Sequence, residues 1–354
     1  MAATQQDLNK SAGNRIDCVT LRLPLQIEKM NLDTPYSDLT PDCLLNAIES
    51  IGVRCDGRLQ PLNSYENRVY QVGLEDGSQC VAKFYRPGRW SDEAILEEHE
   101  FSLELAHQEI PVVPPIPFNG MTLHHWQAYR FTLFAKQGGR TPELEKEETL
   151  EWLGRFLGRI HAVGATSNYR ERPSLDLQSF GIESRDFLIK GEWVPHELRP
   201  AWVSIVDEAL ESVSRIFLRI ANVQMLRLHG DCHPGNLLWT ADGPHFVDFD
   251  DSRMGPAIQD LWMLLSGSAA DMRLQFSAVM RGYETFMEFD DRELHLIEAL
   301  RTLRLIHYSA WIAKRWNDPA FPLAFPWFGT VHYWQDRILE LREQVALMQE
   351  PALS

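Results

Sequence analysis

Two short segments carry the side chains whose types and spacing predict chemistry in this chain. The first is 228–236, LHGDCHPGN, where Asp231 and Asn236 lie five residues apart on a loop bent by Pro and Gly; the second is 246–251, FVDFDD, where Asp248 ends an apolar run. Taken singly, such residues are typical of turns and caps. Their joint spacing instead favours phosphoryl transfer, with Asp231 accepting the proton of an attacking hydroxyl while Asn236 and Asp248 hold Mg²⁺ beside the phosphates.

A second group upstream has the chemistry to hold the phosphates of ATP. Lys83 ends the apolar strand segment 81–84, VAKF, which is the placement of the phosphate-binding lysine in protein kinases. The following helix offers three glutamates as ion-pair partners for it, Glu97, Glu98 and Glu100. No G-x-G-x-x-G motif precedes Lys83, but a tight turn at 62–70 offers backbone N–H groups and the Ser64 hydroxyl. In isolation these would be ordinary surface and turn residues; upstream of the Asp231 loop they predict a nucleotide site.

Composition restricts the partners. With 34 Lys and Arg against 50 Asp and Glu, the formal charge is −16, which argues against nucleic acid and anionic membranes and favours cationic or neutral partners. The five cysteines show no C-x-x-C spacing, and no segment has the roughly 18 consecutive apolar residues of a membrane helix. His229 and His233 share a loop that cannot present both on one helix face, so zinc is not expected. We expect a cytoplasmic protein without disulfides.

The elements that must position these residues divide the chain in two. Residues 1–35 are polar and predict a loosely ordered extension. Residues 36–137 predict a nucleotide-binding lobe with one antiparallel sheet, in which period-two alternation marks three strands within 59–84. Two further strands are expected at 118–123 and 127–134, and helices at 41–52 and 94–108. The Gly pair at 138–139 predicts a hinge.

Residues 138–354 predict a larger, mostly helical lobe that binds the acceptor and carries out catalysis. Apolar residues recur at helical spacing in six segments, 146–163, 199–220, 257–266, 271–288, 291–316 and 331–349. The segment 225–251 interrupts them with a strand, a loop, a second strand and a turn. The fold class is therefore α+β, with two lobes and ATP between them.

These motifs resemble the aminoglycoside phosphotransferase and choline kinase branch of the protein-kinase-like fold, and within it the bacterial stress-response serine/threonine kinases. The resemblance covers nearly the whole chain from about residue 36. It is carried by the segments 62–72, 81–90, 95–100, 226–239, 246–251, 255–265 and 316–322. It implies Ser64 at ATP, Asp231 as the catalytic acid/base, Asn236 and Asp248 at Mg²⁺, and, from the wider fold, Lys83 at the phosphates.

The resemblance also fixes details that spacing leaves open. The interval to the segment 110–112, IPV, selects Glu98 as the partner of Lys83, and backbone groups of 131–135, around Phe134, would meet the adenine. Asp260 corresponds to an aspartate that supports the catalytic loop. The extension before residue 36 and one extra residue in the turn 240–243 depart from the family pattern, and neither touches the chemistry.

The resemblance implies a monomeric kinase that transfers the γ-phosphoryl of Mg-ATP to Ser or Thr of proteins, including itself. A rival is a small-molecule kinase acting on an aminoglycoside, choline-like or homoserine-like alcohol, which the negative charge and the aromatic residues near 311–334 would suit. A pseudokinase scaffold is a third hypothesis, disfavoured by the intact motif residues. Cys232, beside Asp231, is interpreted as a loop residue filling space or, alternatively, as a redox switch.

Overall fold

Residues 34–353 are described by the computed structural model, and they fall within one compact unit that begins at Asn31. The predicted extension, residues 1–35, therefore lies outside the described residues except for its last two positions. Within the described range, no helix has the length and apolar character needed to cross a membrane.

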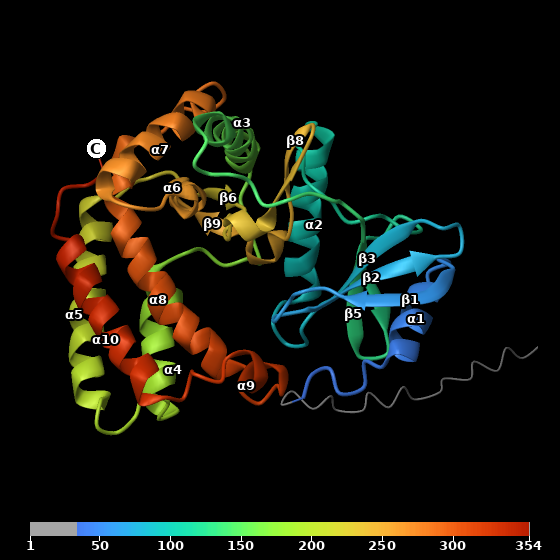
Figure 1. Ribbon diagram of the computed structural model, residues 1–354, viewed down its shortest axis with the longest axis horizontal. Helices are drawn as coiled ribbons and strands as arrows, with labels where there is room; N and C mark the ends of the chain where they lie inside the picture. Colours follow the sequence, from blue (N-terminus) through green and yellow to red (C-terminus); the bar gives the residue numbers. More distant parts are fainter. Residues whose placement is uncertain (1–33, 354) are drawn as a thin grey trace, which may run out of the picture. The chain divides into compact units, whose positions relative to one another are not determined.

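A five-stranded antiparallel sheet forms the first part of the described chain (Figure 1). Its spatial order is β1 (Cys55–Pro61), β2 (Arg68–Leu74), β3 (Gln79–Phe84), β5 (Tyr129–Ala135) and β4 (His124–Trp126). The central strand β3 places Lys83 between Val69 of β2 and Thr132 of β5. Alternation of the side chains buries Ala82, Phe84, Phe131 and Leu133, which explains the period-two pattern of the sequence.

Two helices accompany this sheet, α1 (Pro41–Glu49) and α2 (Asp92–His107). The Ser91 side chain caps α2 by accepting a hydrogen bond from the N–H of Ala94. Ile95 packs with Tyr85 and Leu123 in a small apolar cluster, so α2 is fixed against the strand that carries Lys83.

One predicted strand is wrong. The segment 118–123 forms only a bridge between Phe118 and Met121, because Asn119 and Gly120 both have positive φ and turn the chain. The strand begins instead at His124.

The remaining chain is mostly helical, as the sequence predicts. Its helices are α3 (Glu147–Gly164), α4 (Glu183–Lys190), α5 (Arg199–Arg219), α6 (Ile258–Leu261), α7 (Ala269–Tyr283), α8 (Ile297–Lys314), α9 (Ala320–Ala324) and α10 (Val331–Leu347). The predicted helices at 257–266 and 291–316 each include a 3₁₀ segment, at 262–264 and 291–296, and the one at 271–288 ends at Tyr283. Sequence analysis did not predict helix α4, because its apolar residues, 187–189, are consecutive rather than helically spaced.

Two small pairs of antiparallel strands belong to this part of the chain, and the motif residues lie just after strands of these pairs. Strands β6 (Leu226–Leu228) and β9 (Arg253–Gly255) form one pair, and β7 (Leu237–Thr240) and β8 (Gly243–Phe246) form the other. The Asp231 loop follows β6, and Asp248 lies just after β8. The predicted α+β class, with an antiparallel sheet followed by a larger helical part, is confirmed.

Candidate active site

Two adjoining cavities bring the motif residues together. The larger, of about 420 Å³, includes Asp231 and residues of α8 in its lining; the smaller, of about 260 Å³, includes Lys83 and a group of valines. Five residues line both cavities, Asn63, Ser64, Gly235, Asn236 and Asp248. Three of the five, Ser64, Asn236 and Asp248, are the residues that sequence analysis assigns to phosphate and metal, so the cavities meet at the predicted site of transfer.

The smaller cavity has an apolar wall and one buried cation. Its apolar lining is Leu62, Val69, Val81, Val113, Phe134, Ala135, Leu238 and Val247. Phe134 reaches this wall from β5, opposite Val81 of β3. Ser64 lies where the cavity joins the larger one. An apolar slot beside a cation suits a planar base followed by phosphates.

Asp260 of α6 fixes the Asp231 loop through two hydrogen bonds. Both of its carboxylate oxygens accept backbone hydrogen bonds, from the N–H of His229 and from that of Gly230, each at 2.8 Å. Gly230 has φ +84°, and a Cβ there would lie 2.2 Å from the carbonyl oxygen of Asp251. The loop can thus pass the Asp251 backbone only with glycine at this position.

Asp231 lines the larger cavity with its side chain 21% exposed, and one basic side chain lies at each carboxylate oxygen. Arg304 Nη2 is 2.7 Å from its Oδ1, and His233 Nε2 is 3.5 Å from its Oδ2. Burial tends to raise the pKa of Asp231, but the hydrogen bond from His233 and the charge of Arg304 outweigh it and hold that pKa well below its usual value. Asp231 is therefore a carboxylate at neutral pH, as a proton acceptor must be.

Asn236 and Asp248 present oxygen atoms toward the same space. The Asn236 side-chain N–H donates to the Asp231 carbonyl, and its Oδ1 has no partner among residues 34–353, so it is available to bind a cation. The side chain of Asp248 is 51% exposed. Its backbone has φ +62°, a conformation that is strained for a non-glycine residue and recurs at functional sites. One amide oxygen and one carboxylate fit Mg²⁺, which binds few protein ligands and completes its shell with phosphates and water.

Lys83 lies fully buried among carboxylates. Its Nζ is 3.0 Å from Asp248 Oδ1, 3.2 Å from Asp250 Oδ1 and 3.9 Å from Glu98 Oε1. Burial favours the neutral amine, but these carboxylates, Asp248 foremost, raise the pKa of Lys83 well above its usual value. The lysine is thus a fixed positive charge at the wall of the smaller cavity.

The three candidate glutamates of α2 lie in different surroundings. Glu98 is buried, faces Lys83 and is 2.9 Å from Arg172 Nη2. Glu97 accepts hydrogen bonds from the backbone N–H groups of 170–172, and Glu100 is exposed. Glu98 is therefore the glutamate of this group that approaches Lys83, although its shorter contact is to Arg172.

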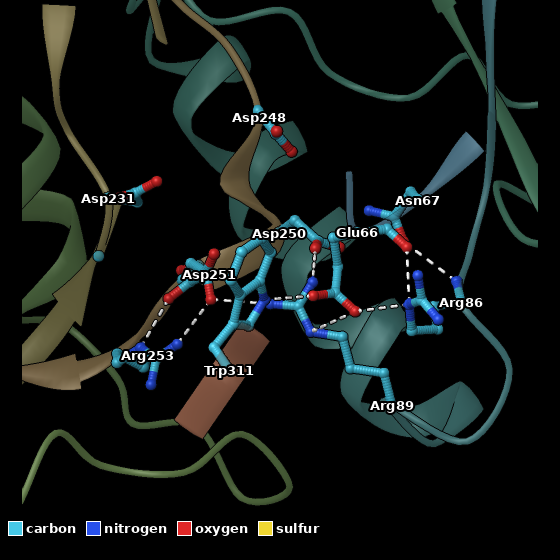
Figure 2. A network of polar contacts seen from close by, with 12 residues as sticks. Glu66, Asn67, Arg86, Arg89, Asp231, Asp248, Asp250, Asp251, Arg253 and Trp311 are labelled. Carbon is cyan, nitrogen blue, oxygen red and sulfur yellow. Dashed lines mark hydrogen bonds and ion pairs between the residues drawn. The ribbon is translucent and has the colours of Figure 1, made fainter. Parts of the chain in front are cut away.

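Sequence analysis missed a dense ion-pair network between the turn 62–67 and the helical part (Figure 2). Glu66 contacts Arg86 at 3.1 Å, Arg315 at 2.6 Å and the Trp311 N–H at 2.6 Å. Figure 2 also shows Arg89 between Glu66 and the pair Asp250 and Asp251, to both of which it donates hydrogen bonds. The network fixes the Ser64 turn against α8. Arginines in the segment 85–90, YRPGRW, directly after the Lys83 strand, were the available signal.

The structure also bears on the two histidines of the Asp231 loop, on Trp311 and on Cys232. His229 Nε2 lies 2.9 Å from the Val247 carbonyl, whereas His233 faces Asp231, so the two imidazoles serve separate contacts. Trp311 is partly buried and anchors Glu66. Cys232 has no exposed surface, and burial raises the pKa of its thiol well above the usual value. These observations favour Cys232 as a loop residue filling space over the redox switch, because an inaccessible neutral thiol is inert.

Known proteins are similar to this chain in sequence, and solved structures are similar to it in fold. Residues 58–305 match the model of the phosphotransferase enzyme family. Stress response kinase A of Escherichia coli (strain K12) is 45% identical over 318 residues, covering 90% of this chain and 96% of the relative. Serine/threonine protein kinase RdoA of Salmonella typhimurium is 44% identical with the same coverage.

Solved structures with low sequence identity share the architecture. A complex of amicoumacin kinase with AMP-PNP and Ca²⁺ has a TM-score of 0.69 at 18% identity, covering 88% of this chain and 94% of that one. A microcompartment-associated aminopropanol kinase has a TM-score of 0.64 at 17% identity, covering 86% and 96%. With the family match spanning most of its length and relatives named as kinases, this chain belongs to the phosphotransferase enzyme family and is a kinase.

Proposed function

We propose that this kinase transfers the γ-phosphoryl group of Mg-ATP to serine or threonine hydroxyls of proteins. The observation that carries the proposal is the meeting of two cavities at Ser64, Asn236 and Asp248, with Lys83 on one side and Asp231 on the other. One cavity suits a nucleotide and the other an acceptor, so a phosphoryl group would pass between them at their junction.

On the nucleotide side, the apolar wall of the smaller cavity holds the base beside Phe134, and Lys83 binds the phosphates. Ser64, held over the junction by the Glu66 network, adds a hydroxyl and backbone N–H groups. Asn236 and Asp248 would hold Mg²⁺, which offsets the negative charge that builds up on the phosphates during transfer.

On the acceptor side, Asp231 orients the hydroxyl and takes its proton. The acceptor oxygen forms a bond to the γ-phosphorus while the bond from that phosphorus to the bridging oxygen of ADP breaks. Asp260 and Gly230 contribute by fixing the loop, so that Asp231 is in position before the acceptor arrives.

The names of the relatives support a protein acceptor, because RdoA is named a serine/threonine protein kinase and its alignment covers 90% of this chain. The rival from sequence analysis, a kinase for a small alcohol, predicts a different product. The two are separated by what carries the label after incubation with γ-labelled ATP.

The test incubates the purified chain with γ-labelled ATP and Mg²⁺, alone, with lysate proteins, and with aminoglycosides, choline and homoserine. We expect labelled protein bands, with label lost in Asp231→Asn. Asp242→Asn, the same change on an exposed turn, is the matched control and keeps activity. Label confined to small molecules would overturn the protein acceptor, and no transfer to any acceptor would overturn the proposed function.

A further inference from the structure

The charge of the acceptor cavity differs from that of the whole chain. Five carboxylates line the larger cavity, Glu66, Asp231, Asp248, Asp250 and Asp251. Each one already contacts a cation: Arg86 and Arg315 at Glu66, Arg304 at Asp231, Lys83 at Asp248 and Asp250, and Arg89 and Arg253 at Asp251. Although the whole chain has a net charge of −16, each carboxylate of this cavity is already paired, so none is left unpaired for a cationic acceptor.

Two arginines line the same cavity, and they differ in how many guanidinium N–H groups are still unpaired. Arg253 is nearly buried, and its Nε and Nη2 donate to the carbonyl and the carboxylate of Asp251. Arg304 is 45% exposed and uses only Nη2, toward Asp231 Oδ1 at 2.7 Å. Within residues 34–353 no other hydrogen bond or ion pair engages the Arg304 guanidinium, so its remaining N–H groups have no partner among these residues, although Arg304 lines the cavity.

An acceptor hydroxyl that reaches Asp231 must pass within contact distance of Arg304, because the two side chains touch. A guanidinium with unused N–H groups binds a carboxylate or phosphate oxygen through charge-assisted hydrogen bonds. An ammonium group at the same place would meet only a cation and carboxylates that are already paired.

We propose that Arg304 is a specificity-determining residue that binds an oxyanion of the acceptor, so that the preferred substrate is a serine or threonine flanked by a carboxylate or phosphate side chain. The inference rests on the proposed protein-kinase function and adds the class of acceptor. It disfavours the cationic alcohols that the overall negative charge would suit, because the cavity presents its spare hydrogen bonds from a cation.

The test uses synthetic peptides with one Ser or Thr acceptor among neutral residues and a single Glu, phosphoserine or Lys at each flanking position in turn. Transfer from γ-labelled ATP gives kcat/KM for each peptide. For the unaltered chain we expect Glu or phosphoserine at one or two positions to raise kcat/KM by about 10- to 100-fold over the neutral peptide, the range of a charge-assisted hydrogen bond. Comparison of Glu with phosphoserine separates the two sources of the oxyanion.

Arg304→Gln should abolish this ratio, and Arg304→Lys should keep part of it. The ratio is measured within each variant, so a uniform, partial loss of activity does not change it, and Arg304→Lys, which keeps a cation beside Asp231, supplies the ratio if Arg304→Gln is inactive. Arg301→Ala is the matched control: Arg301 lies one turn earlier on α8, pairs with Glu298 and does not line the cavity, so it should keep the full ratio.

The outcomes separate this inference from the proposed function. If the unaltered chain phosphorylates the peptides without an acidic preference, or if Arg304→Gln keeps the preference, the inference is overturned and the protein-kinase proposal stands. If amino alcohols alone are phosphorylated, or nothing is, both are overturned.

Discussion

Replacing Gly230 by alanine tests whether the geometry of the Asp231 loop limits the reaction. The new Cβ would lie 2.2 Å from the carbonyl oxygen of Asp251, whereas real contacts of this kind are seldom below 3.0 Å, so the loop must move by about 1 Å. Such a displacement next to the proton acceptor should lower kcat by roughly 10²-fold. The φ of +84° adds strain of about 1–2 kcal/mol.

Gly77→Ala is the matched control for this experiment. Gly77 lies in the β2–β3 turn with φ +86°, and a Cβ there meets nothing within 4 Å, so the control carries the same backbone strain without the clash. Both variants are assayed for transfer from γ-labelled ATP, for nucleotide binding by titration calorimetry, and for thermal unfolding. We expect both to bind nucleotide, with the larger loss of stability in Gly230→Ala, where the clash adds to the strain, and with the loss of kcat confined to that variant. Equal kcat in the two variants would refute the reasoning.

Three further predictions follow from single side chains. Asp231→Asn should keep nucleotide binding and lower phosphoryl transfer by about 10²- to 10⁴-fold, and transfer within a few-fold of the unaltered chain would remove Asp231 from the reaction. Cys232 should resist N-ethylmaleimide in the folded chain and react after unfolding, as read by mass spectrometry; rapid labelling of the folded chain would contradict its burial. Burial raises the pKa of Glu293 from 4.5 to about 7, so the folded chain retains a proton that the unfolded chain releases, and stability should fall by up to roughly 3 kcal/mol as pH rises from 4.5 to 7. Glu293→Gln should flatten that slope in denaturant titrations, and an unchanged slope would assign it to other groups.

The sequence alone determined the fold class and was enough to predict the candidate reacting groups. Local patterns suffice for both: period-two alternation specifies the strands around Lys83, helical spacing specifies most of the later helices, and the spacing of Asp231, Asn236 and Asp248 reflects one loop and one strand end. The resemblance to a kinase family also selected Glu98, which the structure turns toward Lys83.

Only the tertiary structure decided which charges meet. Glu66 and Arg315 are 249 positions apart in the chain and in contact in the fold, and Asp231 meets Arg304 across a separation of 73. Such pairs leave no local period or motif, because an ion pair depends on how whole elements pack rather than on neighbouring residues. Burial is equally nonlocal: Cys232 adjoins the candidate base in sequence, yet the packing of the core around it removes the thiol from solvent. The overall charge of −16 favoured cationic or neutral partners, whereas the packing of two arginines at the larger cavity leaves Arg304 with unused N–H groups there.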